Sequence, residues 1–290
     1  GADVYLNSNN GPMCGNFEIP GSVSNYSNLG GQVSATWTGS VAGMSVESTT
    51  RVPTDKLYFV TDVELCNTTG ADMNDVYFIR HVDPDNEQPW TFFFETNNTI
   101  VSQNAPPCNE TLVTAEGDTY GCFLGLGTRH PAAKVTYGGF YTPDNPADVW
   151  NGVPPFNQSG GNTFEDEAIT IAFYFPTIAA GACENFACAY ILNPADLDEA
   201  LDATDTGLTV MAHGIDVSSS LQYTTCDGSV DIELVGADDY DWTWTPSTGL
   251  NVDTGSAVTV NTNSTVTYTA NGVGGACGTI NRDITIMYDT

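Results

Sequence analysis

Apolar and polar residues alternate in short runs along most of the chain, which is the pattern of strands with one buried face. The clearest runs cover residues 57–65 and 169–175, and shorter ones occur at Val4/Leu6, Val33/Ala35/Trp37, Val76/Phe78, Phe92/Phe94, Val135/Tyr137 and Leu208/Val210. Clusters of Gly, Asn, Asp and Pro separate the runs, as at residues 67–70 and 83–86, and such residues favour tight turns. The pattern predicts an all-β fold, with a large antiparallel β-sandwich over residues 1–206.

One segment near the end of this first domain has a helical pattern instead. Asn193 can cap a helix, Pro194 suits the first helical position, and the acidic residues that follow lie at the positive end of the helix dipole. These features predict a short helix near residues 194–202 that closes the domain.

From about residue 208 the strands become shorter, with turns every ~8–12 residues, as in a β-sandwich. Their apolar positions are Val230/Ile232/Leu234, Tyr240/Trp242/Trp244, Val258/Val260, Val266/Tyr268/Ala270 and Ile284/Ile286/Tyr288. Cys226 precedes the first of these strands and Cys277 follows the Tyr268 strand. This placement predicts a Cys226–Cys277 disulfide across a second, smaller sandwich over residues 207–290, with Trp242 or Trp244 in its core.

A distinctive set of residues runs through this second domain. It comprises Cys226-x-Gly228, Tyr240-x-Trp242-x-Trp244-Thr-Pro246-x-x-Gly249-Leu250, Val258-x-Val260, Thr265-Val-x-Tyr268-Thr269 and Cys277. The set resembles the immunoglobulin-like modules of Bacteroidetes surface proteins, similar to PKD-type and gliding-adhesin repeats, over about residues 214–290. The resemblance implies an immunoglobulin-like sandwich that acts as a spacer or contact surface in a secreted or surface-anchored protein. Residues 1–206 resemble no named family, and a fold alone does not fix a function.

The charge of the chain excludes one broad class of function. The chain has six Lys and Arg residues and 36 Asp and Glu residues, which gives a net charge of −30. Nucleic-acid binding requires clustered cations instead. Because 41% of the residues are hydrophobic and only 14% are charged, the chain has enough apolar side chains for a core. Its longest apolar stretch, residues 168–175, is far shorter than the ~20 residues of a membrane-spanning helix. The chain begins with Gly and no export signal, so a mature, globular protein that does not span a membrane is expected.

Eight cysteines without any CxxC pair favour disulfides over zinc or redox sites, and therefore an extracellular or cell-surface location. Besides Cys226–Cys277, closeness along the chain favours Cys183–Cys188 and Cys108–Cys122, which leaves Cys14–Cys66 by elimination. Eight cysteines allow 105 different sets of four bridges, so these three pairings stay open.

The sequence lacks the usual signs of catalysis. His81, His130 and His213 lie far apart, without the spacing of a metal or triad motif, and no nucleophile elbow or phosphate-binding loop is present. Glu165 and Glu167 enter a predicted strand, where alternation would place both carboxylates on one face, as in a glycoside hydrolase. The third acid of such a strand is missing, so we expect no enzyme and keep a hydrolase as a minor alternative.

One turn has the pattern of a cation site. Asp83, Asp85 and Glu87 place carboxylates at alternate positions, which suits calcium, although a solvated acidic turn is the simpler explanation in so acidic a chain. No other cofactor is indicated. Trp37, Trp90 and Trp150 can stack on sugar rings, but single tryptophans in β-proteins belong more often to the core.

These features together favour an extracellular structural protein, a subunit of a surface filament or a segment of an adhesin. Val4, Tyr5 and Leu6 form an extended segment that can complete the sheet of another copy, which would give a head-to-tail polymer. The alternative for this segment is an ordinary edge strand of its own sheet. The alternative function is a secreted carbohydrate- or calcium-dependent binding module, with glycans or other cell-surface ligands as partners.

Overall fold

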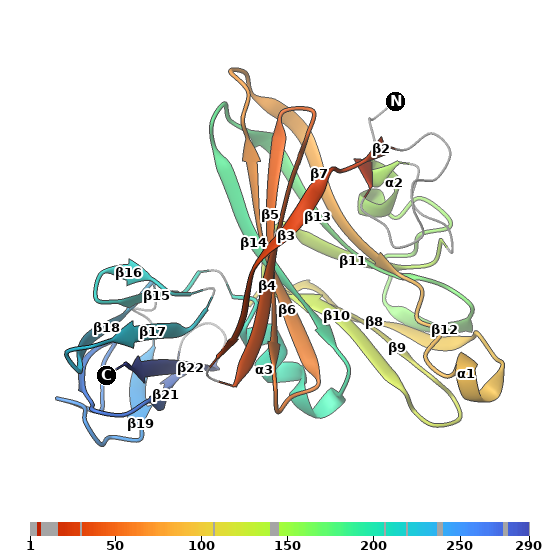
Figure 1. Cartoon of the computed structure of the whole chain (residues 1–290). Helices are drawn as coiled ribbons and strands as arrows, with labels where there is room; N and C mark the ends of the chain where they lie inside the picture. Colours follow the sequence, from red (N-terminus) through yellow and green to blue (C-terminus); the bar gives the residue numbers. More distant parts are fainter. Residues whose placement is uncertain are drawn as a thin grey trace.

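The computed structural model describes residues 5–6, 17–29, 31–106, 108–139, 145–205, 207–218, 220–236, 240–274 and 278–289. Most of these residues lie in strands, which confirms the all-β prediction. Among the described strands, β1 to β14 form one group of sheets and β15 to β22 another, and no sheet contains strands from both (Figure 1). We refer to the two groups as the N-terminal unit and the C-terminal unit.

The N-terminal unit is built on one wide antiparallel sheet of nine strands. In spatial order these are β12 (Gly161–Glu165), β8 (Thr96–Ala105), β9 (Glu110–Glu116), β10 (Phe123–Thr128), β14 (Cys183–Ile191), β6 (Tyr58–Asn67), β5 (Met44–Pro53), β4 (Gln32–Val41) and β3 (Gly21–Leu29). A second sheet of three strands packs on it: β11 (Ala133–Tyr137), β13 (Ile169–Ile178) and β7 (Met73–Val82). Phe173 of β13 and Phe186 of β14 are buried between the two sheets, with ring centroids 4.4 Å apart.

Short helices cover the remaining faces of this unit. α2 (Pro146–Asn151) packs Val149 against Ala172 of β13. η1 (Pro194–Asp196) and α3 (Leu197–Asp202) confirm the predicted helix, and the Asn193 side chain accepts a hydrogen bond from the Ala195 amide, as the capping pattern predicts. α1 (Gln88–Thr91) contains no buried residue. Within the described residues, none of the helices has the length and apolar character needed to cross a membrane.

The C-terminal unit consists of two four-stranded sheets. One contains β16 (Ile215–Asp216), β15 (Thr209–Ala212), β18 (Ser229–Val235) and β20 (Ala257–Asn261), and the other contains β17 (Gln222–Thr225), β22 (Thr279–Tyr288), β21 (Val266–Val273) and β19 (Asp241–Thr245). Exposed and buried residues alternate strictly along β18 and β19, as predicted from the sequence. Trp242 and Trp244 are both buried in the core between these sheets.

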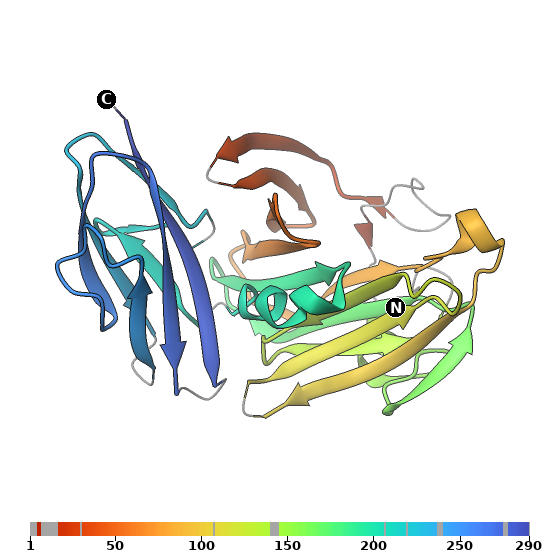
Figure 2. The ribbon, with the colours of Figure 1, turned by 90° about the horizontal axis from the view of Figure 1, so that it is seen from below.

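The two units meet beside α3 (Figure 2). A cleft of about 1040 Å³ between them is lined by residues of both. Arg282 of β22 is buried here and donates hydrogen bonds to the backbone oxygens of Asn281 (2.9 Å) and Asp205 (3.4 Å). Arg51 of β5 binds Asp62 through two hydrogen bonds, of 2.6 and 2.9 Å, and also donates to the Ala203 oxygen. The junction is therefore polar: Arg282 of the C-terminal unit reaches Asp205 at the end of the N-terminal unit, and Arg51 contacts Ala203 of its own unit.

Candidate functional site

Three carboxylates come together at one end of the N-terminal unit. Asp83 and Asp85 follow β7, and Asp166 lies in the turn between β12 and β13. β7 and β13 are neighbours, with Val82 opposite Ile169, so the turn after one strand meets the turn before the other. The ligand oxygens of the three residues all lie within 4.8 Å of one another, and we call them the acidic cluster. One oxygen of Asp85 is buried without a hydrogen-bond partner in the described structure.

The carboxylates of this cluster repel one another. Burial, and then the charges of Asp85 and Asp166, raise the pKa of Asp83 to about 6. Burial also raises the pKa of Asp85 and of Asp166, with a further contribution from Asp166 in the first case and from Glu95 in the second. Such a group of oxygens suits a hard divalent cation, which would remove the repulsion. The acidic cluster therefore contains two of the three residues that the sequence predicted as ligands, Asp83 and Asp85.

Glu87, the third predicted ligand, has a different role. Its buried carboxylate accepts hydrogen bonds from the backbone amides of Thr119 (2.9 Å), Tyr120 (2.7 Å) and Cys122 (3.2 Å). Burial by itself raises the pKa of Glu87, but these hydrogen bonds outweigh it and the pKa is lowered. Glu87 therefore fixes the loop between β9 and β10, and the prediction that it is a metal ligand is wrong.

An exposed set of aromatic side chains lies next to the acidic cluster. The alternation of Phe92 and Phe94 predicted a half-buried strand, and this prediction is wrong, because both residues lie in the loop between α1 and β8. Seven large aromatic side chains are exposed in the described part of the chain, and all but Tyr26 lie in or next to this loop. We call these six residues the aromatic ridge: Trp90, Phe92, Phe93, Phe94, Tyr120 and Phe164, with exposed fractions from 45% to 79%.

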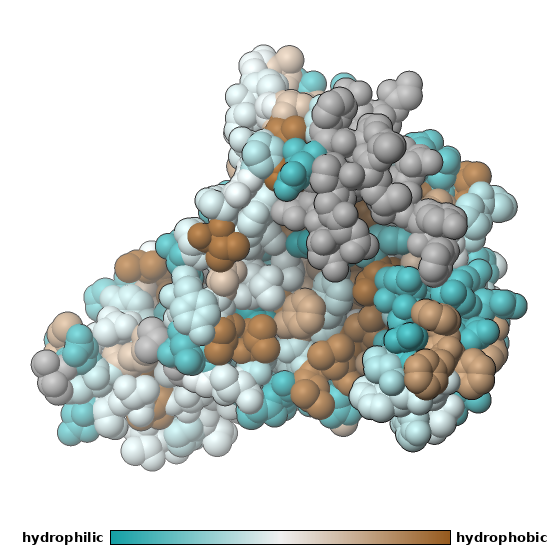
Figure 3. Space-filling model, turned by 45° about the vertical axis from the view of Figure 1, so that its right-hand side comes forward, coloured by the Kyte–Doolittle hydropathy of each residue, from teal (hydrophilic) through white to brown (hydrophobic). Residues whose placement is uncertain are grey.

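The backbone explains why the ridge residues are close together. Phe92 to Phe94 lead directly into β8, and Phe164 of β12 pairs with Asn97 of β8. Tyr120 belongs to the loop that Glu87 holds beside α1. On this side of the molecule apolar side chains lie next to a band of hydrophilic ones (Figure 3). Trp90 is thus exposed as a sugar-stacking residue would be, whereas Trp37 and Trp150 are only partly exposed and contact other residues of the unit.

Glu165 and Glu167 do not lie on one face of a strand. β12 ends at Glu165 and β13 begins at Ile169, so the two glutamates flank a turn. One carboxylate oxygen of Glu167 is buried without a partner among the described residues, and burial, followed by the charge of Glu165, raises the pKa of Glu167. The geometry on which the hydrolase alternative depended is therefore absent.

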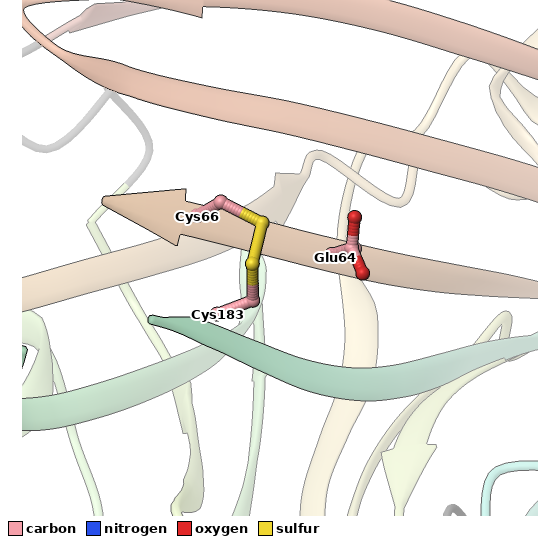
Figure 4. Close-up of side chains that lie close together, drawn as sticks. All are labelled: Glu64, Cys66 and Cys183. Atoms are coloured by element: carbon pink, nitrogen blue, oxygen red, sulfur yellow. A yellow bond between two sulfur atoms is a disulfide. The ribbon is translucent and has the colours of Figure 1, made fainter. Parts of the chain in front are cut away.

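The disulfides differ from the predicted pairings. Cys66 of β6 is bonded to Cys183 of β14, directly opposite it in the sheet (Figure 4). This bond excludes both Cys14–Cys66 and Cys183–Cys188, and Cys188 is a buried free thiol. Glu64 lies beside the two sulfurs, but an oxidised pair offers no thiolate to a metal.

The remaining cysteines also depart from the expected scheme. Cys108 is disulfide-bonded but Cys122 is free, so the predicted Cys108–Cys122 bridge is wrong. Cys226 is a free and exposed cysteine, contrary to the predicted bridge to Cys277. Cys14 and Cys277 lie outside the described residues.

The two edge strands of the nine-stranded sheet, β3 and β12, have different characters. β3 carries exposed Val23 and Tyr26, and the chain has no charged residue between Glu18 and Glu47. β12, at the other edge, leads into Glu165, Asp166 and Glu167.

The N-terminal segment pairs within its own chain. Tyr5 and Leu6 form β1 (Tyr5–Leu6), which runs parallel to β2 (Phe17–Glu18) just before β3. Val4, the other predicted contact residue, lies outside the described part of the chain.

Comparisons with known proteins leave the family of the chain open. No protein-family model matches the chain, and no curated protein does. Among the solved structures that match is a polysaccharide lyase, at 12% sequence identity and a TM-score of 0.34, with 88% of this chain and 36% of the lyase chain covered. The chain thus spans little more than a third of that protein's length, and a likeness of this strength establishes neither family nor function.

Proposed function

We propose that this chain is an extracellular structural protein that assembles with copies of itself, as a subunit of a surface filament or a segment of an adhesin. The supporting observation is the open, uncharged edge formed by β3. The Cys66–Cys183 disulfide supports the extracellular location, because such bonds persist in oxidising compartments. The proposed role requires no catalysis.

Charge is the main obstacle to self-association in this protein. Two copies that each carry a net charge of −30 repel one another wherever their acidic surfaces meet. At the chain's average density, the segment between Glu18 and Glu47 would hold about four charged residues, yet it holds none. β3 lies within this segment, so it is the edge at which a second copy meets least repulsion.

The edge itself has few of the features that prevent strand addition. Natural sheets protect their edges with Lys, Pro or bulges. β3 contains neither Lys nor Pro, and Val23 is 68% exposed. It has one bulge, between Ser24 and Ser27, which bends the strand and leaves residues 21–24 as a regular stretch. A strand of another copy can hydrogen-bond to this stretch.

Two different strands of the second copy can pair with this edge. The N-terminal segment with Tyr5 and Leu6 would give an open head-to-tail polymer, as the sequence predicts. Pairing of β3 with β3 would give a closed dimer. Both arrangements use the same edge of the first copy.

A lysine at the edge tests the proposal. We expect the wild-type chain to assemble as its concentration rises, and Val23→Lys to remain monomeric, because the new charge lies on the pairing strand. Light scattering after size exclusion gives the mass, and electron microscopy separates filaments from dimers. Val101→Lys is the matched control, since Val101 is 55% exposed but lies on β8, an internal strand of the same sheet. A wild-type chain that stays monomeric, or a Val23→Lys variant that assembles normally, would contradict the proposal.

A second candidate function, a calcium- or carbohydrate-dependent binding module, is favoured by a separate observation. The oxygens of Asp83, Asp85 and Asp166 lie close enough together to share one cation. The exposed ring of Trp90, five residues after Asp85 in the chain, is the candidate for stacking on a sugar. The two candidate functions use different elements, the edge strand β3 and the turns next to β7 and β13, and do not exclude each other.

A further inference from the structure

We propose that the aromatic ridge and the open edge of β12 together bind an extended, basic peptide segment of a partner protein. The segment would add a strand to β12 and place its Arg or Lys side chains over the aromatic rings and beside the carboxylates. This inference is independent of self-assembly at β3, which lies at the opposite edge of the same sheet.

The ridge leaves large apolar side chains in contact with water, which is costly. Six of the seven exposed aromatic residues of the described chain gather here. Phe92 is the most exposed of them, at 79%, and its backbone is left-handed with φ at 62°. This conformation ends α1, because the Phe92 amide donates a hydrogen bond to the Gln88 oxygen (2.9 Å), and it leaves the Phe92 ring in solvent. A contiguous patch of exposed apolar rings is typical of an interaction surface.

The open edge of β12 favours a peptide over other ligands. β12 pairs with β8 from Gly161 opposite Ile100 to Glu165 opposite Thr96, and no other described strand pairs with its outer side. An extended peptide can hydrogen-bond to this edge through its own backbone, which a glycan or a lipid cannot do in the same register. Phe164 is on this strand, so side chains of an added strand would reach the ridge.

The charge of this end of the molecule selects a basic partner. The acidic cluster, Glu95 and Glu165 all lie here, and none of the salt bridges among the described residues involves them. Arg51, Lys56, Arg129 and Arg282 line the cleft between the units, Lys134 lies over the Trp150 ring, and Arg80 lies over the Phe78 ring. An incoming Arg or Lys would gain both the attraction of the carboxylates and cation–π contacts with exposed rings. An anionic membrane or a nucleic acid would be repelled.

The exposed rings distinguish this site from the other acidic surfaces of the chain. Any acidic surface of the protein attracts cations, but the ridge is the one cluster of exposed aromatic rings in the described residues. Because a guanidinium stacks on rings better than an ammonium does, the site should prefer Arg to Lys.

The test uses the full chain and a fluorescent peptide in which Arg and Thr alternate, at low ionic strength with a chelator present. We expect binding that weakens at least tenfold, the effect of about 1.4 kcal/mol, in the triple variant Trp90→Ala, Phe92→Ala, Phe93→Ala. The Lys–Thr peptide should bind more weakly, and N-methylation of alternate backbone amides should weaken binding several-fold. Leu57→Ala is the control, because Leu57 is 57% exposed but lies next to β6, away from the ridge.

Three results would overturn the inference. Equal binding to the wild type and to the triple variant would show that charge alone attracts the peptide. Equal binding of the N-methylated peptide would exclude strand addition. A neutral oligosaccharide that binds through the ridge, with no peptide binding, would make the site a glycan site instead. None of these results changes the expectation for Val23→Lys.

Discussion

Asp83 shows how one titrating side chain links the acidic cluster to stability. Its pKa in the folded protein is about 6, against 3.8 for an unperturbed Asp. Between these two values the folded state holds a proton that the unfolded state has released, so the contribution of Asp83 favours folding at low pH. That contribution falls as the pH rises through 4 to 6. At neutral pH the cluster is therefore a source of repulsion that a cation can relieve.

Calcium should stabilise the protein only at pH values at which the acidic cluster is ionised. We expect about 5 mM calcium, above the ~0.1–1 mM dissociation constants of extracellular calcium modules, to raise Tm by a few degrees at pH 7. At pH 4.5 the increase should disappear, because Asp83 is protonated. Thermal unfolding with calcium, with magnesium and with a chelator measures the effect.

Asp85→Asn provides the test of the site. Removing one charge should raise the stability of the calcium-free protein at pH 7 and abolish the response to calcium. Asp253→Asn, an exposed change in the C-terminal unit, should leave the response intact. An undiminished calcium response in Asp85→Asn would place the bound ion elsewhere.

The local sequence predicted only part of this site. Alternate acids at residues 83, 85 and 87 suggested three ligands, but a pattern within five residues cannot show which backbone amides approach from elsewhere. Glu87 is held by amides of the loop at residues 119–122, and Asp166 comes from a different turn. The position of Asp166 depends on the pairing of β7 with β13, and that of Glu87 on the contact of its turn with the β9–β10 loop; no spacing within the turn contains either.

At the scale of elements, strands were easier to predict than their partners. The alternation along β18 and β19 fixed which side chains are buried, because it follows directly from strand geometry. The same alternation failed at Phe92 and Phe94, where both rings are exposed. A period of two shows only that residues share a side, and whether another layer covers that side depends on the rest of the fold.

The Cys66–Cys183 bond is the clearest case of a partner that closeness in sequence could not show. The two cysteines are 117 residues apart but directly opposite each other in neighbouring strands. Closing so long a loop restricts the unfolded chain, so we expect Cys66→Ser with Cys183→Ser to lower the free energy of unfolding by about 2–4 kcal/mol. Urea unfolding measures the loss.

The free cysteine Cys226 supplies the control for this experiment. Cys226→Ser alters an exposed thiol that forms no bond, and its urea midpoint should match that of the wild type. If the double variant also kept the wild-type midpoint, the bond would not contribute to stability and the strand ladder alone would hold β6 to β14.

Most of the few positive charges of the molecule gather at the cleft between its two units. Four of the six cationic residues line the cleft between the two units, and Arg129 pairs there with buried Asp202. This leaves one sheet edge uncharged, at β3, and the other acidic and aromatic, at β12. The two proposals of binding use these two edges, and among the cationic residues Arg282 links the units at the cleft.

A substitution of Arg282 tests whether its hydrogen bond fixes the orientation of the two units. Arg282 is buried and forms no salt bridge among the described residues, and burial lowers its pKa to about 10 although the charge of Asp205 opposes this. Replacing it with Met removes a desolvated charge, so the stability of the C-terminal unit should change by less than about 1 kcal/mol or increase. The hydrogen bond to the Asp205 oxygen is lost, so the units should move more freely.

Small-angle scattering should then show a larger radius of gyration for Arg282→Met, and proteolysis near residues 203–208 should be faster. Glu233→Gln, an exposed change on β18, should alter neither measurement. The reason for the expected difference is that Arg282 and Arg51 hold the same short segment, at Asp205 and Ala203, from opposite units. Unchanged scattering and proteolysis in Arg282→Met would mean that apolar packing, and not these hydrogen bonds, fixes the orientation of the units.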